Sequence, residues 1–150
     1  MATIRITKEF KFESAHALLG YDGPCKNIHG HSYKMAVTLI GKPINDETSP
    51  KNGMVMDFGD LKQIVNESIV KPFDHALVLN AKTKNVNSAE VKFMSGKLIL
   101  ADYQPSCENL LIDFAERIQN KLPSNVKLFS IRLDETSNSF AEWFASDNES

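Results

Sequence analysis

The sequence has few cysteines, no long apolar run and little net charge. Two cysteines in 150 residues, Cys25 and Cys107, are too few for a disulfide framework, so a reducing cytoplasm is expected. No apolar run approaches the roughly 20 residues of a membrane span, and the first residues lack the apolar core of a signal peptide. A net charge of −2 attracts no polyanion. We therefore expect a cytoplasmic protein with neither a membrane nor a nucleic acid as partner.

What is present is the composition of one globular domain covering residues 1–150. Apolar residues make up 42% of the chain and charged residues 24%. A chain of this length can bury a proper core. We find no internal repeat and no low-complexity tract that would divide it.

Four strands are predicted from the alternation of apolar and polar residues. The first two should form a long antiparallel hairpin whose connecting loop carries most of the histidines. The last two are joined by a turn that begins at Asp134. The predicted strands are 4–13, 33–39, 126–133 and 139–144.

Two helices are predicted between these hairpins. The first should begin at Asp57 and stop at Pro72, and the second should begin at Ser106 and end before Pro123. The segment around Ser95-Gly96 resembles a further short hairpin. The main order, ββααββ, predicts an α+β fold with a four-stranded antiparallel sheet and two helices on one face.

The open edges of such a sheet lead to a second expectation, which concerns assembly. Four strands covered on one side leave two edges and one face open, and long open edges need a partner. We therefore expect a homo-oligomer in which subunits close a barrel.

The residues on which a functional reading depends are three histidines within 16–31. His29 and His31 are two apart, so in an extended segment both rings point the same way, and His16 ends a predicted strand. Three neutral imidazoles with one open position form the ligand set of a catalytic zinc. The alternative is that these are loop histidines hydrogen-bonded to backbone carbonyls.

Other chemically active residues are weaker signals by themselves. Cys25 beside the histidines is either a reactive thiol or an inert buried one. Asp74-His75 is either an acid–base pair or a polar turn that opens a strand. Glu135 by itself would be read as a solvated turn carboxylate.

Taken together, these motifs resemble the pterin synthase family, which includes 6-pyruvoyl-tetrahydropterin synthase and 6-carboxytetrahydropterin synthase. The resemblance runs from about residue 4 to residue 144. The motifs are Phe12-Glu-Ser-Ala-His16, Cys25-Lys-Asn-Ile-His29-Gly-His31, Gly53-Met-Val-Met-Asp57-Phe, Phe73-Asp74-His75, Pro105-Ser-Cys-Glu108-Asn and Leu133-Asp-Glu135-Thr.

The resemblance implies a tunnelling fold, in which three subunits close a β-barrel and two rings stack as a homohexamer. It also implies roles for eight residues. Zn²⁺ would be held by His16, His29 and His31; Cys25, Asp74 and His75 would be catalytic; Glu135 and Glu108 would bind the pterin.

The implied substrate is 7,8-dihydroneopterin triphosphate, which must lose a carbon-bound proton beside side-chain hydroxyls. Zinc chelating those oxygens acidifies the neighbouring C–H bond. A thiol near a cation is a suitable base because its pKa is lowered. Asp74 can orient His75, and the Glu135 carboxylate matches two pterin N–H donors.

Three residues separate Cys25 from His29, which resembles the 6-carboxy branch of queuosine precursor synthesis. We expect a zinc-dependent lyase that forms 6-carboxytetrahydropterin and releases acetaldehyde and triphosphate. The stretch 81–103 is longer than usual for that branch. The alternatives are a 6-pyruvoyl-tetrahydropterin synthase, a zinc-dependent hydrolase and a non-catalytic pterin-binding module.

Overall fold

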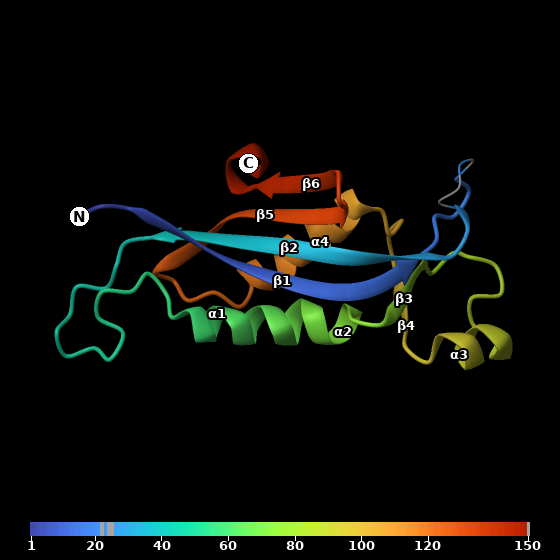
Figure 1. Ribbon diagram of the computed structural model, residues 1–150, viewed down its shortest axis with the longest axis horizontal. Helices are drawn as coiled ribbons and strands as arrows, with labels where there is room; N and C mark the ends of the chain where they lie inside the picture. The colour runs from blue at the N-terminus through green and yellow to red at the C-terminus, as the bar shows by residue number, and fades with distance from the viewer. Residues whose placement is uncertain (22, 24–25, 150) are drawn as a thin grey trace.

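A mixed, curled β-sheet organises the chain (Figure 1). The computed structural model describes residues 1–21, 23 and 26–149, and these contain six strands in the order β4-β3-β1-β2-β5-β6. The strands are β1 (Ile4–His16), β2 (His29–Gly41), β3 (Ala76–Asn80), β4 (Leu98–Ala101), β5 (Val126–Thr136) and β6 (Ser139–Phe144).

The α+β class and the four predicted strands are confirmed, but the four-stranded, wholly antiparallel sheet is wrong. β1, β2, β5 and β6 pair antiparallel, as expected. β3 pairs parallel with β1, and β4 pairs parallel with β3, so both extend the sheet on that side. The β3 run was visible in the sequence only as the segment after Asp74-His75. Its pairing with β1 depends on contacts across more than sixty residues.

The predicted hairpin around Ser95-Gly96 is also wrong. Residues Ala89–Ser95 form a helix, α3, that leads into β4. The Ser88 side chain caps α3 by accepting a hydrogen bond from the Val91 N–H group, and Gly96 ends it with a φ of 51°. These local signals favour a helix over a two-residue turn. Parallel pairing of β3 with β4 then needs a crossover, which the α3 segment supplies.

Both predicted helices are confirmed. α1 (Phe58–Val65) continues through a π-helical turn, η2 (Asn66–Val70), into α2 (Lys71–Phe73), and Asp57 caps it by accepting from the Gly59 N–H group at 2.6 Å. Pro72 is the penultimate residue of α2, so this continuous helical segment ends one residue after the predicted stop. Ser106 caps α4 (Cys107–Gln119), and a short 3₁₀ turn, η3 (Ala145–Asn148), follows β6.

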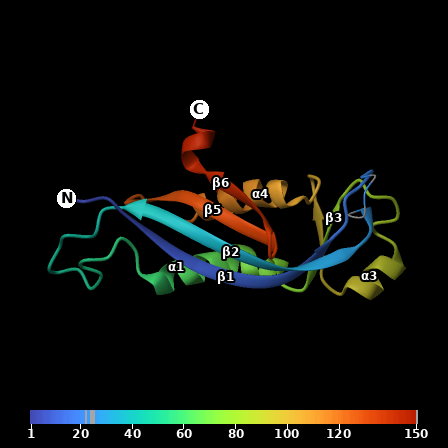
Figure 2. The ribbon, with the colours of Figure 1, turned by 45° about the horizontal axis from the view of Figure 1, so that its top comes forward.

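The core lies between the sheet and these helices (Figure 2). Phe12 stacks on Tyr33 with ring centroids 5.2 Å apart, and Phe114 from α4 packs edge-on against Phe73 at 4.9 Å. On β1 and β2, the rows that contribute these core residues continue into the three histidines. None of the helices in the described ranges is long and apolar enough to cross a membrane.

Candidate metal centre

The three histidines meet at one end of the β1–β2 pair. His16 lies directly opposite His29 in the antiparallel register, and His31 lies two residues along the same strand. One nitrogen from each ring can be chosen so that all three lie within 4.8 Å of one another. The ring centroids are 4.5 to 5.1 Å apart. The predicted convergence of the histidines is confirmed.

Backbone carbonyls set the tautomer of two of these rings. The Nδ1–H group of His16 donates to the Pro105 carbonyl at 2.7 Å, and that of His29 donates to the Asn27 carbonyl at 2.7 Å. Because a carbonyl only accepts, each Nδ1 carries the proton and each Nε2 presents a lone pair. Hydrogen bonding to backbone carbonyls, the alternative to metal binding, therefore accounts for Nδ1 of His16 and of His29. It leaves the other nitrogen facing the centre.

The inward-facing nitrogens lack ordinary partners. His16 Nε2 and His29 Nε2 are 3.0 Å apart, so two lone pairs face each other unless a proton or cation lies between them. His31 Nε2 is buried and has no hydrogen-bond partner among the described residues. Buried polar atoms are normally paired. Three unpaired nitrogens pointing at one place fit a metal ion.

Burial favours the neutral, metal-binding form of two of the rings, His16 and His31. Burial lowers the pKa of His16, which is only 2% exposed, and the charge of a protonated His29 lowers it further. Burial likewise lowers the pKa of His31, although the Glu135 carboxylate opposes that shift. Both rings are therefore poised to donate lone pairs at neutral pH. This donor set fits a divalent metal.

Glu135 lies beside this centre. Its Oε1 is 3.8 Å from His31 Nε2, and its side chain is only 23% exposed. The predicted turn beginning at Asp134 is wrong, since β5 extends to Thr136 and carries Glu135 within a strand. Strand geometry holds the carboxylate toward the histidines. Glu135 is therefore not a freely solvated turn carboxylate.

The second cysteine, Cys107, lies near the charges of both Glu135 and Glu108. Burial raises the pKa of Cys107 to about 12, and the charges of Glu135 and Glu108 add to the shift. The Cys107 thiol faces the Leu133 carbonyl at 3.5 Å. Glu108 is exposed in the first turn of α4. Cys107 is thus a protonated, structural thiol, close to both proposed pterin carboxylates.

Asp74 and His75 form a pair, as predicted, with Asp74 Oδ2 3.1 Å from His75 Nδ1. The Glu13 N–H group donates to Asp74 Oδ1 at 2.9 Å, and this bond is the main cause that lowers the pKa of Asp74. His75 adopts a positive φ of 60°, and its side chain is 77% exposed. The carboxylate is therefore held in place while the imidazole is presented outward.

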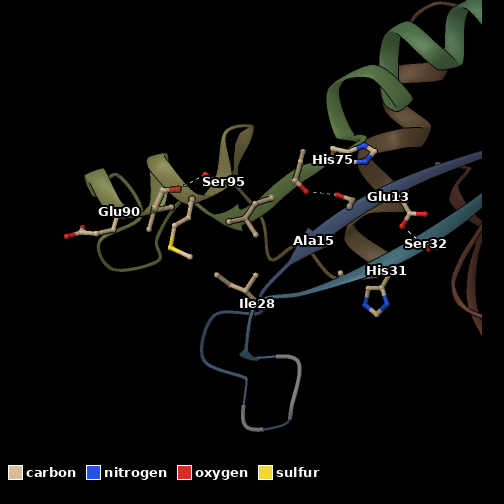
Figure 3. A pocket seen from close by; sticks show the side chains of 14 residues that line it. Glu13, Ala15, Ile28, His31, Ser32, His75, Glu90 and Ser95 are labelled. Atoms are coloured by element: carbon tan, nitrogen blue, oxygen red, sulfur yellow. Dashed lines mark hydrogen bonds between the residues drawn. The ribbon is translucent and has the colours of Figure 1, made fainter.

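The pair does not face the three histidines in this chain. A cavity of about 570 Å³ is bordered by both His31 and His75. Figure 3 shows the His31 ring pointing away from His75. The rest of the cavity wall comes from β1, β2, β3, α3 and the residue just before β2. Its apolar part is Ala15, Ile28, Ala76, Leu77, Val91 and Met94. The predicted thiol, Cys25, lies outside the described residues.

Comparison with known proteins decides the family. The profile described as "6-pyruvoyl tetrahydropterin synthase" matches residues 5–146. The chain belongs to this family.

Two curated relatives and one solved structure illustrate the range of similarity. The 6-carboxy-5,6,7,8-tetrahydropterin synthase of Haemophilus influenzae is 37% identical over 93% of this chain and 97% of its own length. The 6-pyruvoyl tetrahydrobiopterin synthase of Pongo abelii is 35% identical over 85% of this chain and 75% of its own. The 6-pyruvoyl tetrahydropterin synthase of Plasmodium vivax superposes with a TM-score of 0.73 at 18% identity, over 95% and 98% of the two chains. It shares the fold.

Family membership confirms the resemblance and a synthase-type enzyme, but it gives no hint of two features that only the structure shows. One is the use of the Asn27 and Pro105 carbonyls to orient ring nitrogens. Backbone carbonyls are present at every residue, so no sequence pattern could have marked them. The other is α3, which is capped by Ser88 and occupies a segment predicted as part of a short hairpin.

Proposed function

We propose that the protein is a zinc-dependent lyase acting on 7,8-dihydroneopterin triphosphate. Its product would be 6-carboxy-5,6,7,8-tetrahydropterin, with acetaldehyde and triphosphate released, in the cytoplasmic synthesis of the queuosine precursor. The observation that carries the proposal is the convergence of three imidazoles at one end of β1 and β2. The 6-carboxy name of a relative 37% identical supports the choice of product.

The metal proposed for His16, His29 and His31 is Zn²⁺, since three imidazoles with an open position match a catalytic zinc. When bound, the ion would supply a Lewis acid for the side-chain oxygens of the substrate. The carbonyls of Pro105 and Asn27 hold two of the rings in the tautomer that leaves Nε2 free for it.

The chain's own groups would bind the pterin and move protons. Glu135 would accept two N–H bonds from the pyrimidinone edge, with Glu108 as a second carboxylate nearby. Cys25 would transfer the carbon-bound proton. His75 would exchange a proton on the other side, with Asp74 fixing its ring through the 3.1 Å contact. The depressed pKa of Asp74 keeps that carboxylate charged and able to orient the imidazole.

We also propose that the active form is a homo-oligomer, a dimer of trimers in which sheets from three chains close a barrel. β4 and β6 are the two edges of the described sheet. His75 is presented outward and away from His31, a placement suited to a partner's site. Both features support assembly of sites from more than one chain.

The experiment is incubation of the zinc-loaded protein with dihydroneopterin triphosphate, followed by product analysis. Acetaldehyde release with a 6-carboxy product supports the proposal. A 6-pyruvoyl product would instead establish the second candidate, which the 6-pyruvoyl name of the Pongo abelii relative favours. Binding of a pterin without turnover would establish a non-catalytic module. A Cys25→Ala variant with full activity would exclude proton transfer by the thiol and favour a zinc-dependent hydrolase.

A further inference from the structure

The Gln104 side chain makes a double hydrogen bond with the backbone of a residue 85 positions away. The Leu19 N–H group donates to Gln104 Oε1 at 3.0 Å, and Gln104 Nε2 donates to the Leu19 carbonyl at 2.7 Å. One side-chain amide thus satisfies both backbone groups of Leu19. The contact ties the chain that leaves β1 to the segment that precedes α4.

The next residue along that segment contacts a metal ligand directly. The Pro105 carbonyl accepts the Nδ1–H bond of His16 at 2.7 Å. Gln104 therefore holds Leu19, and the next residue, Pro105, holds His16. The last residue of β1 and the chain that follows it are fixed at two points by one short segment.

This segment is itself anchored on two other elements. Asn109, in the first turns of α4, donates from Nδ2 to the Gln104 carbonyl at 3.0 Å. Asn80, at the end of β3, approaches Gln104 Oε1 with its Nδ2 at 3.4 Å. Asn109 therefore holds the backbone of Gln104, and Asn80 lies against its side-chain amide. The position of Gln104 is thus set by contacts with α4 and with the end of β3.

We propose that Gln104 is a positioning residue of the metal centre, acting through Leu19 and Pro105 on the orientation of His16. Loss of the amide would free the chain after His16 and loosen the register between that chain and the Pro105 carbonyl. His16 would then sample orientations in which Nε2 no longer faces His29 and His31. Residues that orient ligands in this way typically change metal affinity by about 10- to 100-fold. The inference rests on the proposed function only in requiring a metal at the three histidines.

The test compares metal binding by the metal-free full-length wild type, Gln104→Met and Gln104→Glu. Met keeps the length of the side chain and removes both hydrogen bonds, whereas Glu keeps only the acceptor for Leu19 N–H. The matched control is Gln63→Met, because Gln63 is an exposed residue of α1 whose side chain donates a hydrogen bond to Glu67 at 3.4 Å, within the helical segment and away from the histidines. Zn²⁺ affinity is measured by competition with a chelator. The visible spectrum of the Co²⁺-loaded protein reports ligand geometry.

Gln104→Met is expected to weaken Zn²⁺ binding by about tenfold or more and to alter the Co²⁺ spectrum. Gln104→Glu should lie between this variant and the wild type, and Gln63→Met should match the wild type. A Gln104→Met protein with wild-type affinity and spectrum overturns the inference while leaving the metal centre intact. A wild type that binds neither ion contradicts the proposed function itself. If Gln104→Met does not fold, a Gln104→Glu protein with wild-type affinity and spectrum overturns the inference.

Discussion

At the scale of single residues, His31 differs from the other two histidines of the centre. His16 and His29 each place Nδ1 on a backbone carbonyl, while His31 Nε2 is buried beside Glu135 without a hydrogen-bond partner in the described ranges. A buried, unpaired nitrogen costs free energy in the metal-free protein. A bound cation would remove that cost. Metal binding should therefore stabilise the fold as well as serve the chemistry.

The fourth histidine offers a control for this centre. His31→Ala should weaken Zn²⁺ binding by more than about 100-fold, since loss of outer-shell partners alone costs about 10- to 100-fold. His75→Ala removes a ring that is 77% exposed and lies outside the group of three, so it should bind Zn²⁺ like the wild type. Chelator competition measures both. Equal affinity of the two variants would show that the three histidines do not form the metal site.

Cys107 should be an unreactive thiol. Burial raises its pKa to about 12, so almost none of it is thiolate at pH 8. A thiol reagent added to the folded protein should modify the wild type and Cys107→Ser to the same extent within minutes. Denaturant should reveal one additional thiol in the wild type. Rapid labelling of Cys107 in the folded wild type would contradict its assignment as structural.

Asp74 predicts a pH effect whose direction follows from its pKa. The Glu13 N–H bond lowers that pKa in the folded state, so the unfolded state binds more protons at acidic pH. The stabilisation is fully present above the unfolded value of about 3.9 and is lost as the pH falls through the lower folded value. The difference in unfolding free energy between wild type and Asp74→Asn should therefore shrink from pH ~5 to pH ~2. Urea titrations measure it, and a constant difference would contradict the pairing.

At the scale of elements, the helices α3 and α4 differ most in how much of their surface is buried. The apolar stripe of α4 is buried, including Phe114 at 0% exposure. None of the described residues of α3 is buried, and Phe93 is 90% exposed. The α4 prediction succeeded because its apolar period is set by packing on the sheet. α3 was missed because a helix outside the core shows no such period.

The two phenylalanines test this contrast. Phe114→Ala should lower the free energy of unfolding by about 3–5 kcal/mol, because it leaves a cavity in the core. Phe93→Ala should change it by less than about 0.5 kcal/mol, as expected for an exposed position. Urea unfolding gives both values. A large loss for Phe93→Ala would mean that α3 is covered in the folded protein, as by another subunit.

At the scale of the whole molecule, the sheet leaves one face uncovered. Arg5, Thr7, Glu9 and Lys11 of β1 are exposed on the face opposite the helices. This face is polar, as the inner wall of a barrel filled partly by water would be. The edges β4 and β6 provide backbone groups for joining sheets.

The assembly prediction can be checked by mass. The protein in solution should have a mass that is a multiple of three chains of 16.8 kDa, with the hexamer as the expected species. Light scattering after size exclusion measures it. A monomer over the micromolar range would exclude the barrel assembly and the sharing of His75 between chains.

The sequence by itself determined the class of fold, the caps of the two long helices and the convergence of the histidines. These features depend on local periodicity: a period of two places His29 and His31 on one side, and Asp57 and Ser106 begin helices through their own side chains. Only the tertiary structure decided how the site is oriented. The Pro105 carbonyl reaches His16 across 89 residues, and β3 and β4 join β1 through pairing that no local pattern encodes. Hydrogen bonds made by backbone groups far along the chain depend on where the chain folds, so they follow from the packed structure and not from residue type.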